Sequence, residues 1–224
     1  IVSDMTKNQV SSISQTNANL VNSYLQNMNV FSNTLAKEVT HYKELDTEQG
    51  ETFVIDSLKG ILNDKDIFGA YFAFEPNKYF EDTPNGLSYY AYKDNGKISV
   101  DILNDYSTYK SGDYYTGAKN TMKAHVTEPY EYKLSNGSSV WLVTLSNPIV
   151  DASGNFIGVA NCDILSDTLS NLPYSDGNYK TSYTTIITNN GTYIANTIDK
   201  KLVGSTLTNT STTDSDILEA IGSA

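Results

Sequence analysis

The stretch that decides the fold is "VDASGNFIGVANCDI", Val150–Ile164. It opens with four turn-forming residues, Asp151 to Gly154, and continues as a run that is apolar at nearly every position. A short apolar run bounded by turn residues is typical of a buried strand. The run ends on an acid, Asp163, beside the only cysteine of the chain. Either this acid has reached the sheet edge, where water solvates it, or it faces a binding pocket.

Residues along a strand alternate between its two faces. One face of this strand is small and apolar, and we expect it to pack against a helix: Phe156, Gly158, Ala160, Cys162 and Ile164. The other face carries Ile157, Val159, Asn161 and Asp163, which makes it the candidate pocket face. A single cysteine excludes an intrachain disulfide. Because Cys162 has no basic neighbour in the sequence, we interpret it as a small buried hydrophobe.

Turn signals of the same kind recur along the chain. Asn95-Gly96, Asn136-Gly137 and Asn190-Gly191 each lie between strand-forming runs, and Asn-Gly is the strongest short-range hairpin signal. Residues from about 50 to 168 are therefore predicted to form one antiparallel sheet of about five strands. The segment "LSNLPYSDGNYK", residues 169–180, reads as a boundary, and the last hairpin belongs to a second, shorter module.

Residues 1 to about 45 predict one long helix, because apolar residues such as Val10, Ile13, Leu20 and Met28 recur at helical spacing. No charged residue occurs from Asn8 to Ala36, yet Asn, Gln, Ser and Thr make up more than half of this segment, so it is not a membrane span. The fold class is α+β, with the long helix packed on antiparallel sheet modules. The predicted domains are residues 1–48 (helix), 49–168 (ligand-binding module) and 169–224 (incomplete second module).

Composition excludes several functions. The formal net charge is −11 and the chain has no arginine, so all 15 basic residues are lysine. A nucleic-acid partner is not expected, because no basic stripe is present. Two isolated histidines predict no metal site, and no cofactor is expected. No catalytic motif is found, so we predict that the chain is not an enzyme.

The order of long helix, antiparallel module and second hairpin module, with "GVANCDI" closing the first module and "TIDKKLVG" in the second, resembles a double Cache (dCache) domain. This is the extracytoplasmic ligand-binding region of bacterial methyl-accepting chemotaxis proteins. The resemblance implies two PAS-like modules, the first of them distal to the membrane and binding a small solute. It also implies a location at the cell membrane, transmembrane helices outside this chain, and a homodimer in the full-length receptor.

The resemblance also implies candidate ligand-binding residues. Amino-acid-binding dCache domains share the motif Tyr, then Arg-x-Trp-Tyr, then Tyr-x-Asp after a proline, then a distant Asp that anchors the amine. Here Asp163 matches the distant Asp, whereas the motif arginine falls at Gly112 and the acid of Tyr-x-Asp falls at Tyr132. The full candidate set is Asp163, Tyr115, Tyr130, Tyr114, Tyr132, Asp113, Asn161, Tyr92 and Trp141.

We therefore expect an extracellular chemoreceptor domain that binds an amine or amino acid and signals across the membrane. Because the chain has no arginine to hold a ligand carboxylate, amines that lack a carboxylate are expected to bind at least as well as amino acids. An alternative within the same fold is the ectodomain of a sensor histidine kinase or diguanylate cyclase. An alternative from another class is a cell-surface adhesion module that uses its tyrosine-rich face.

Overall fold

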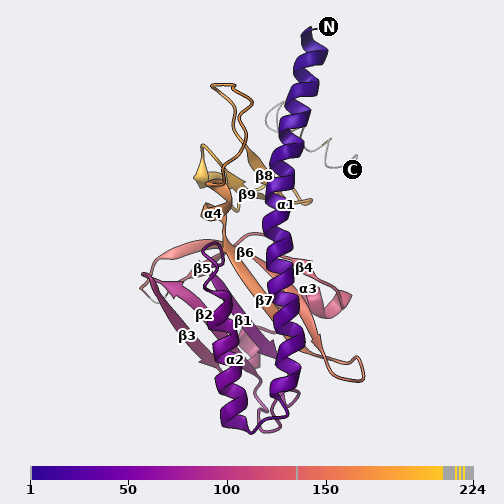
Figure 1. The fold of residues 1–224 in the computed structure, drawn as a ribbon, viewed down its shortest axis with the longest axis vertical. Helices are drawn as coiled ribbons and strands as arrows, with labels where there is room; N and C mark the ends of the chain where they lie inside the picture. Colours follow the sequence, from indigo (N-terminus) through magenta and orange to yellow (C-terminus); the bar gives the residue numbers. More distant parts are fainter. Residues whose placement is uncertain (1, 135, 209–214, 216, 218, 220–224) are drawn as a thin grey trace. The chain divides into compact units, whose positions relative to one another are not determined.

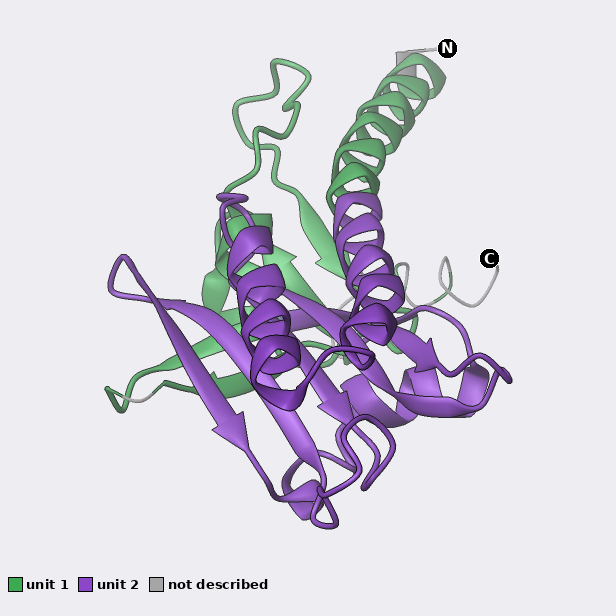
Figure 2. Ribbon diagram, turned by 60° about the horizontal axis from the view of Figure 1, so that its bottom comes forward, with its two compact units in different colours: residues 1–24, 128–142, 165–224 green, residues 25–127, 143–164 purple. Residues whose placement is uncertain are grey.

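The computed structural model describes all residues except 1, 135, 209–214, 216, 218 and 220–224. The chain forms two compact units, coloured in Figure 2: unit 1 holds residues 1–24, 128–142 and 165–224, and unit 2 holds residues 25–127 and 143–164. Helix α1 and strand β6 contribute residues to both. The predicted boundaries after residues 48 and 168 stay a prediction, and residues 209–214, 216, 218 and 220–224 of the predicted last module lie outside the described residues.

The described chain begins with the long helix that the apolar spacing predicted, and a second helix follows it. Helix α1 (Val2–Tyr42) runs for 41 residues, and α2 (Thr47–Ile61) follows after a short turn. Asp46 starts α2 because its carboxylate accepts a hydrogen bond from the Gln49 amide at 2.9 Å. In unit 2, Met28, Leu35 and Val39 of α1 are buried. No helix in the described part of the chain combines the length and apolarity that a membrane span needs.

The sheet of unit 2 has the strand order β3-β2-β1-β7-β6-β4 (Figure 1). The strands are β1 (Gly69–Phe74), β2 (Leu87–Asp94), β3 (Lys97–Leu103), β4 (His125–Val126), β6 (Ser139–Val150) and β7 (Phe156–Leu165). The pairs β1–β2, β2–β3, β1–β7 and β4–β6 are antiparallel. The predicted Asn-Gly hairpin between β2 and β3 is confirmed, with positive φ at both Asn95 and Gly96. The stretch Val150–Ile164 supplies the end of β6, a turn and most of β7, which is an interior strand.

The two faces of this sheet are covered by different helices. The later part of α1 and helix α2 lie side by side over one face (Figures 1 and 2). On that face Asn147 of β6 donates to Asn29 and Ser32 of α1. The opposite face packs on α3 (Asp113–Thr121), where Val159 and Ala73 meet Tyr115 and Ala118. This face carries Asp163, so we call it the α3 face.

One residue departs from the predicted alternation. Phe156 was expected on the helix-packed face, yet its ring lies 5.6 Å from the ring of Tyr115 in α3. Phe156 is the first residue of β7 and comes directly after the Asp151–Gly154 turn, where the alternation of the strand begins.

Unit 1 contains short elements. Strand β5 (Tyr130–Lys133) pairs with residues 139–142 of β6, and β8 (Thr185–Ile187) pairs with β9 (Tyr193–Asn196) across the predicted Asn190-Gly191 turn. The short helices are α4 (Ser166–Ser170) and the 3₁₀ turn η2 (Lys200–Leu202); a further 3₁₀ turn, η1 (Tyr106–Thr108), lies in unit 2. Asn17 ties α1 into unit 1, because it donates to the Ser175 carbonyl and accepts from the Ser175 amide.

Candidate functional site

Asp163 is a buried carboxylate on the α3 face of unit 2. Its side chain is 1% exposed. Oδ1 accepts a hydrogen bond from the Thr144 hydroxyl at 2.5 Å, and Oδ2 accepts one from the Tyr90 hydroxyl at 2.9 Å. Burial raises the pKa of Asp163 to about 7, although both hydrogen bonds act in the opposite direction. The alternative of a solvated acid at a sheet edge is therefore wrong.

A glycine lets Tyr90 reach this carboxylate. Gly69 in β1 lies opposite Asp163 on one side and Tyr92 on the other. A Cβ at Gly69 would lie 2.6 Å from the Tyr90 ring and 2.7 Å from its hydroxyl oxygen. The Tyr90 side chain thus crosses β1 over the space that a larger residue would fill, and the strand register brings its hydroxyl to Asp163.

Four tyrosine rings gather near Asp163; we call Tyr71, Tyr90, Tyr92 and Tyr114 the tyrosine cluster. Tyr71 meets Tyr90 edge-on at 5.3 Å and Tyr114 edge-on at 5.4 Å, and Tyr90 stacks on Tyr92 at 4.9 Å. Burial raises the pKa of Tyr114, and the nearby Asp163 charge raises it further. Aromatic faces beside a carboxylate form the surroundings that attract an organic cation.

Asn161 lies two residues before Asp163 on the same face of β7. It is fully buried, and neither its Nδ2 nor its Oδ1 has a hydrogen-bond partner among the described residues. Its cross-strand neighbour is Tyr71 of the tyrosine cluster. The predicted candidates Asp163, Asn161, Tyr92 and Tyr114 thus all belong to unit 2 and, through the cluster, to one face.

The position of the motif arginine is occupied by another side chain. A Cβ at Gly112, which precedes α3, would lie 2.6 Å from the Tyr114 ring. Lys110, considered as a substitute cation, is exposed, and its Nζ lies 5.9 Å from the centre of the Tyr106 ring. The carboxylate clamp that the motif implies therefore has no counterpart at these two positions.

Tyr115 and Asp113 face other partners. The Tyr115 hydroxyl donates to Glu75 Oε1 at 2.6 Å, and Tyr106 and Lys119 donate to the same oxygen. Burial and the Glu75 hydrogen bond raise the pKa of Tyr115 far above its usual value. Asp113 is half exposed and pairs with His125 at 2.9 Å. These contacts hold α3 in place, and a ligand role for the two residues stays a prediction.

Tyr130, Tyr132 and Trp141 belong to unit 1. Tyr130 and Tyr132 lie on one face of β5, opposite Leu142 and Val140. Trp141 lies on the other face of its strand and covers Gly204, where a Cβ would be 2.0 Å from the indole ring. A ligand role for these three residues also stays a prediction.

The remaining groups to consider are the Cys162 thiol and the side chains that could bind a metal ion. Cys162 is free and buried, and burial raises the pKa of its thiol, as expected for a small buried hydrophobe. Among the described residues, no group of three or more His, Cys, Asp or Glu side chains is placed to hold a metal ion.

The candidate set from the sequence does not include Tyr71, Tyr90, Thr144 or Gly69. The missing information was the register. Once β1 is aligned with β7, Gly69 and Tyr71 fall opposite Asp163 and Asn161. The alternation in "FGAYFAF" could have placed them on one face, but not on this one.

A family model described as "methyl-accepting chemotaxis protein-like, first PDC sensor domain" matches residues 54–171, more than half of the chain. The chain belongs to this sensor-domain family. This confirms the predicted resemblance to the Cache-type sensor domains of chemoreceptors. A search of curated proteins finds no significant match.

Solved structures similar to this sensor domain share its fold. The periplasmic sensory domain of the Campylobacter jejuni chemoreceptor Tlp1 is 13% identical, with a TM-score of 0.73 over 100% of this chain and 84% of that one. The ligand-binding domain of C. jejuni Tlp3, in complex with L-valine, is 20% identical, with a TM-score of 0.67 over 97% and 80%. The extracellular domain of a protein described as a histidine kinase, mmHK1S-Z2, is 24% identical, with a TM-score of 0.70 over 93% and 80%.

Proposed function

We propose that this sensor domain binds a small solute with a cationic nitrogen, an amine or amino acid, on the α3 face of unit 2, outside the cell membrane. The supporting observation is Asp163. Its hydrogen-bond partners are the Tyr90 and Thr144 hydroxyls, and no cationic side chain in the described part of the chain pairs with it. A buried carboxylate without a cation is costly, so a ligand ammonium is the group that would complete the site.

The nature of the surroundings favours amines over carboxylates. The tyrosine cluster supplies π faces, each worth about 0.5–2 kcal/mol to a cation. The chain has no guanidinium to clamp an α-carboxylate. Amines without a carboxylate are therefore expected to bind at least as well as amino acids.

The test is calorimetric titration of the domain with amines, amino acids, nitrogen-free carboxylates and sugars. Asp163→Asn keeps the size of the side chain and removes its charge, so amine affinity should fall about tenfold to a hundredfold. Asp82→Asn, at an exposed acid of the same unit, is the matched control and should bind like the wild type. The proposal is wrong if a sugar or a nitrogen-free carboxylate binds tightest, or if Asp163→Asn binds amines normally.

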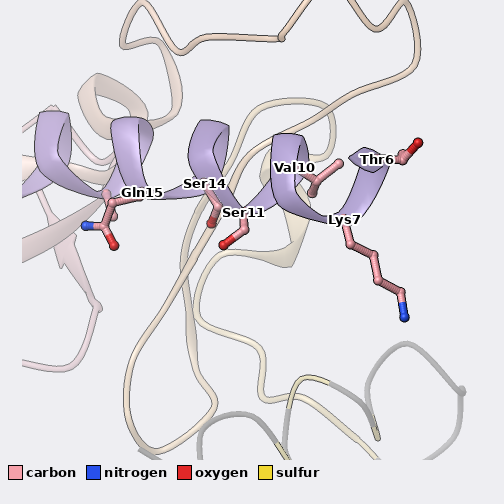
Figure 3. A pocket seen from close by; sticks show the side chains of 7 residues that line it. Thr6, Lys7, Val10, Ser11, Ser14 and Gln15 are labelled. Atoms are coloured by element: carbon pink, nitrogen blue, oxygen red, sulfur yellow. The ribbon is translucent and has the colours of Figure 1, made fainter. Parts of the chain in front are cut away.

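We further propose that the domain forms a homodimer through α1 in the full-length receptor. In unit 1, Val10 is about half exposed and lines a hollow of about 540 Å³ together with small side chains such as Ser11, Ser14 and Ala18 (Figure 3). Small side chains let a second helix approach closely. Sedimentation at high concentration should show self-association that Val10→Asp weakens. A strict monomer would contradict this proposal.

The family and the fold are compatible with two kinds of output. Both chemoreceptor and histidine-kinase sensor domains are among the similar structures. The proposal of a chemotaxis receptor is supported by the matching family, and sequencing the gene beyond the membrane-spanning segments would separate it from a kinase or a cyclase.

A further inference from the structure

Asn161 differs from every other buried asparagine of the described chain. Asn17, Asn147 and Asn196 each hold at least two hydrogen bonds, to backbone or side-chain partners. Asn161 is 0% exposed, yet its carboxamide holds none. Buried polar groups in native proteins are nearly always paired, so an orphaned one needs an explanation.

The surroundings give Asn161 no structural duty that an apolar residue could not perform. It lies in the middle of β7, with Val159 and Asp163 as its neighbours on the same face. Asn147, on the opposite face of β6, shows what a structural asparagine looks like here, because it ties β6 to Asn29 and Ser32 of α1. The carboxamide of Asn161 makes no such tie.

The spacing places Asn161 within reach of a ligand held by Asp163. Residues two apart on one strand face are separated by about 6.6 Å. A cationic nitrogen in contact with the Asp163 carboxylate therefore leaves a polar group that is two carbon atoms further along the ligand near the Asn161 carboxamide. A carboxamide both donates and accepts, so it suits a group that can do the same.

The charge near Asn161 decides which kind of group fits. Three lysines of unit 2 have partners of their own: Lys119 pairs with Glu75, Lys110 lies over Tyr106, and Lys93 donates to the Asp64 carbonyl. A ligand carboxylate would therefore lie beside the Asp163 carboxylate with only neutral groups, the Asn161 amide and tyrosine hydroxyls, to hold it. A neutral carboxamide or hydroxyl meets no such repulsion.

We propose that Asn161 is a specificity-determining ligand contact. Its carboxamide forms hydrogen bonds to a neutral polar group of the solute that lies next to the cationic nitrogen. The inference rests on the proposed function, in which Asp163 binds that nitrogen. The ligand class is then an amine bearing an amide or alcohol, in preference to a bare alkylamine or a free amino acid.

Three probes that carry the same isopropyl group beside the amine test this: isobutylamine, L-valine and L-valinamide. They differ in whether the carbon that bears the amine also carries no polar group, a carboxylate or a carboxamide. In the wild type, L-valinamide should bind about tenfold tighter than isobutylamine, and L-valine should show no such advantage. Asn161→Leu should remove the advantage of L-valinamide and leave isobutylamine binding within about twofold of the wild type. An unchanged L-valinamide advantage in Asn161→Leu would overturn the inference, as would L-valine binding tightest in the wild type.

Thermal unfolding of the ligand-free domain separates this inference from the proposed function. Because its carboxamide has no partner to lose, Asn161→Leu should keep or raise the Tm, whereas the matched variant Asn147→Leu should lower it. A lower Tm in Asn161→Leu would show a structural role and overturn the inference, even if the probes bind. If no probe binds the wild type, the proposed function fails, and the Tm of Asn161→Leu still decides whether the carboxamide is unpartnered.

Discussion

At the scale of the residue, the site depends on what a few positions lack. Asp163 lacks a cation, and Gly69 lacks the Cβ that would block Tyr90. Both absences are local departures from what stabilises a fold best: a buried acid without a cation costs free energy, and glycine weakens a strand interior. Such departures are expected where a protein uses a position for binding rather than for stability.

Gly69→Ala should test whether this glycine makes room for the Tyr90 side chain. The added Cβ would lie 2.6 Å from the Tyr90 ring, so the ring must move and its hydrogen bond to Asp163 weakens. We expect a loss of about 1–3 kcal/mol in the free energy of unfolding, measured by urea denaturation, together with weaker amine binding.

The matched control is Gly60→Ala. Gly60 is an exposed residue of α2 with nothing within 4 Å of a Cβ, so the change should raise the free energy of unfolding by about 0.5–1 kcal/mol. Equal effects of the two substitutions would contradict the role given to Gly69.

At the scale of the element, α3 is held on the sheet by Glu75. This residue follows β1, and one of its oxygens accepts from Tyr106, Tyr115 and Lys119. Burial raises the pKa of Glu75, but the hydrogen bonds from Lys119, Tyr115 and Tyr106 together lower it below its usual value. Because α3 also carries Tyr114, the contact at Glu75 helps to position a member of the tyrosine cluster through the same helix.

Glu75→Ala should therefore loosen α3. It leaves the buried Tyr115 hydroxyl without its partner, which should cost about 1–3 kcal/mol of unfolding free energy, with weaker amine binding as a second effect. Since the folded pKa is below the unfolded one, this stabilisation is present above the unfolded pKa and is lost as the pH falls through the folded pKa. Urea denaturation should show the wild type losing its advantage over Glu75→Ala in acid. Glu81→Ala, at an exposed acid, is the control.

At the scale of the whole molecule, the proposed site would link ligand binding to pH and to folding stability. The pKa of Asp163 is raised by burial to about 7, above its unfolded value. The folded state therefore binds the proton more tightly than the unfolded state. As the pH rises from about 4 to 7, ionisation of Asp163 lowers the stability of the empty domain, by an amount on the order of 4 kcal/mol.

Amine binding should show the opposite pH dependence. A cation needs the ionised carboxylate, so below pH 7 the affinity should fall by up to about tenfold per pH unit. Calorimetric titration from pH 5 to 8.5 checks this, and Asp163→Asn should flatten the profile. A profile that is flat in the wild type would remove Asp163 from the binding step.

The sequence by itself determined the elements and their kind. Asn-Gly turns between strand-forming runs specify hairpins because both residues accept positive φ, and the uncharged, periodic N-terminal segment specifies one long helix. These signals are local, so they can be read without the fold. Turn, strand and acid also follow one another within fifteen residues, which marks Asp163 as a candidate, and the resemblance to the dCache motif made it the leading one.

Only the tertiary structure decided which side chains surround that acid. Tyr90 and Thr144 are 73 and 19 residues from Asp163 in the chain, and they meet it through strand order and register. Conversely, Tyr115 is next to Tyr114 in sequence, but successive helix residues point in different directions, so it contacts Glu75 instead. Sequence spacing orders residues along one element, whereas a binding site is a property of the surface that several elements form together.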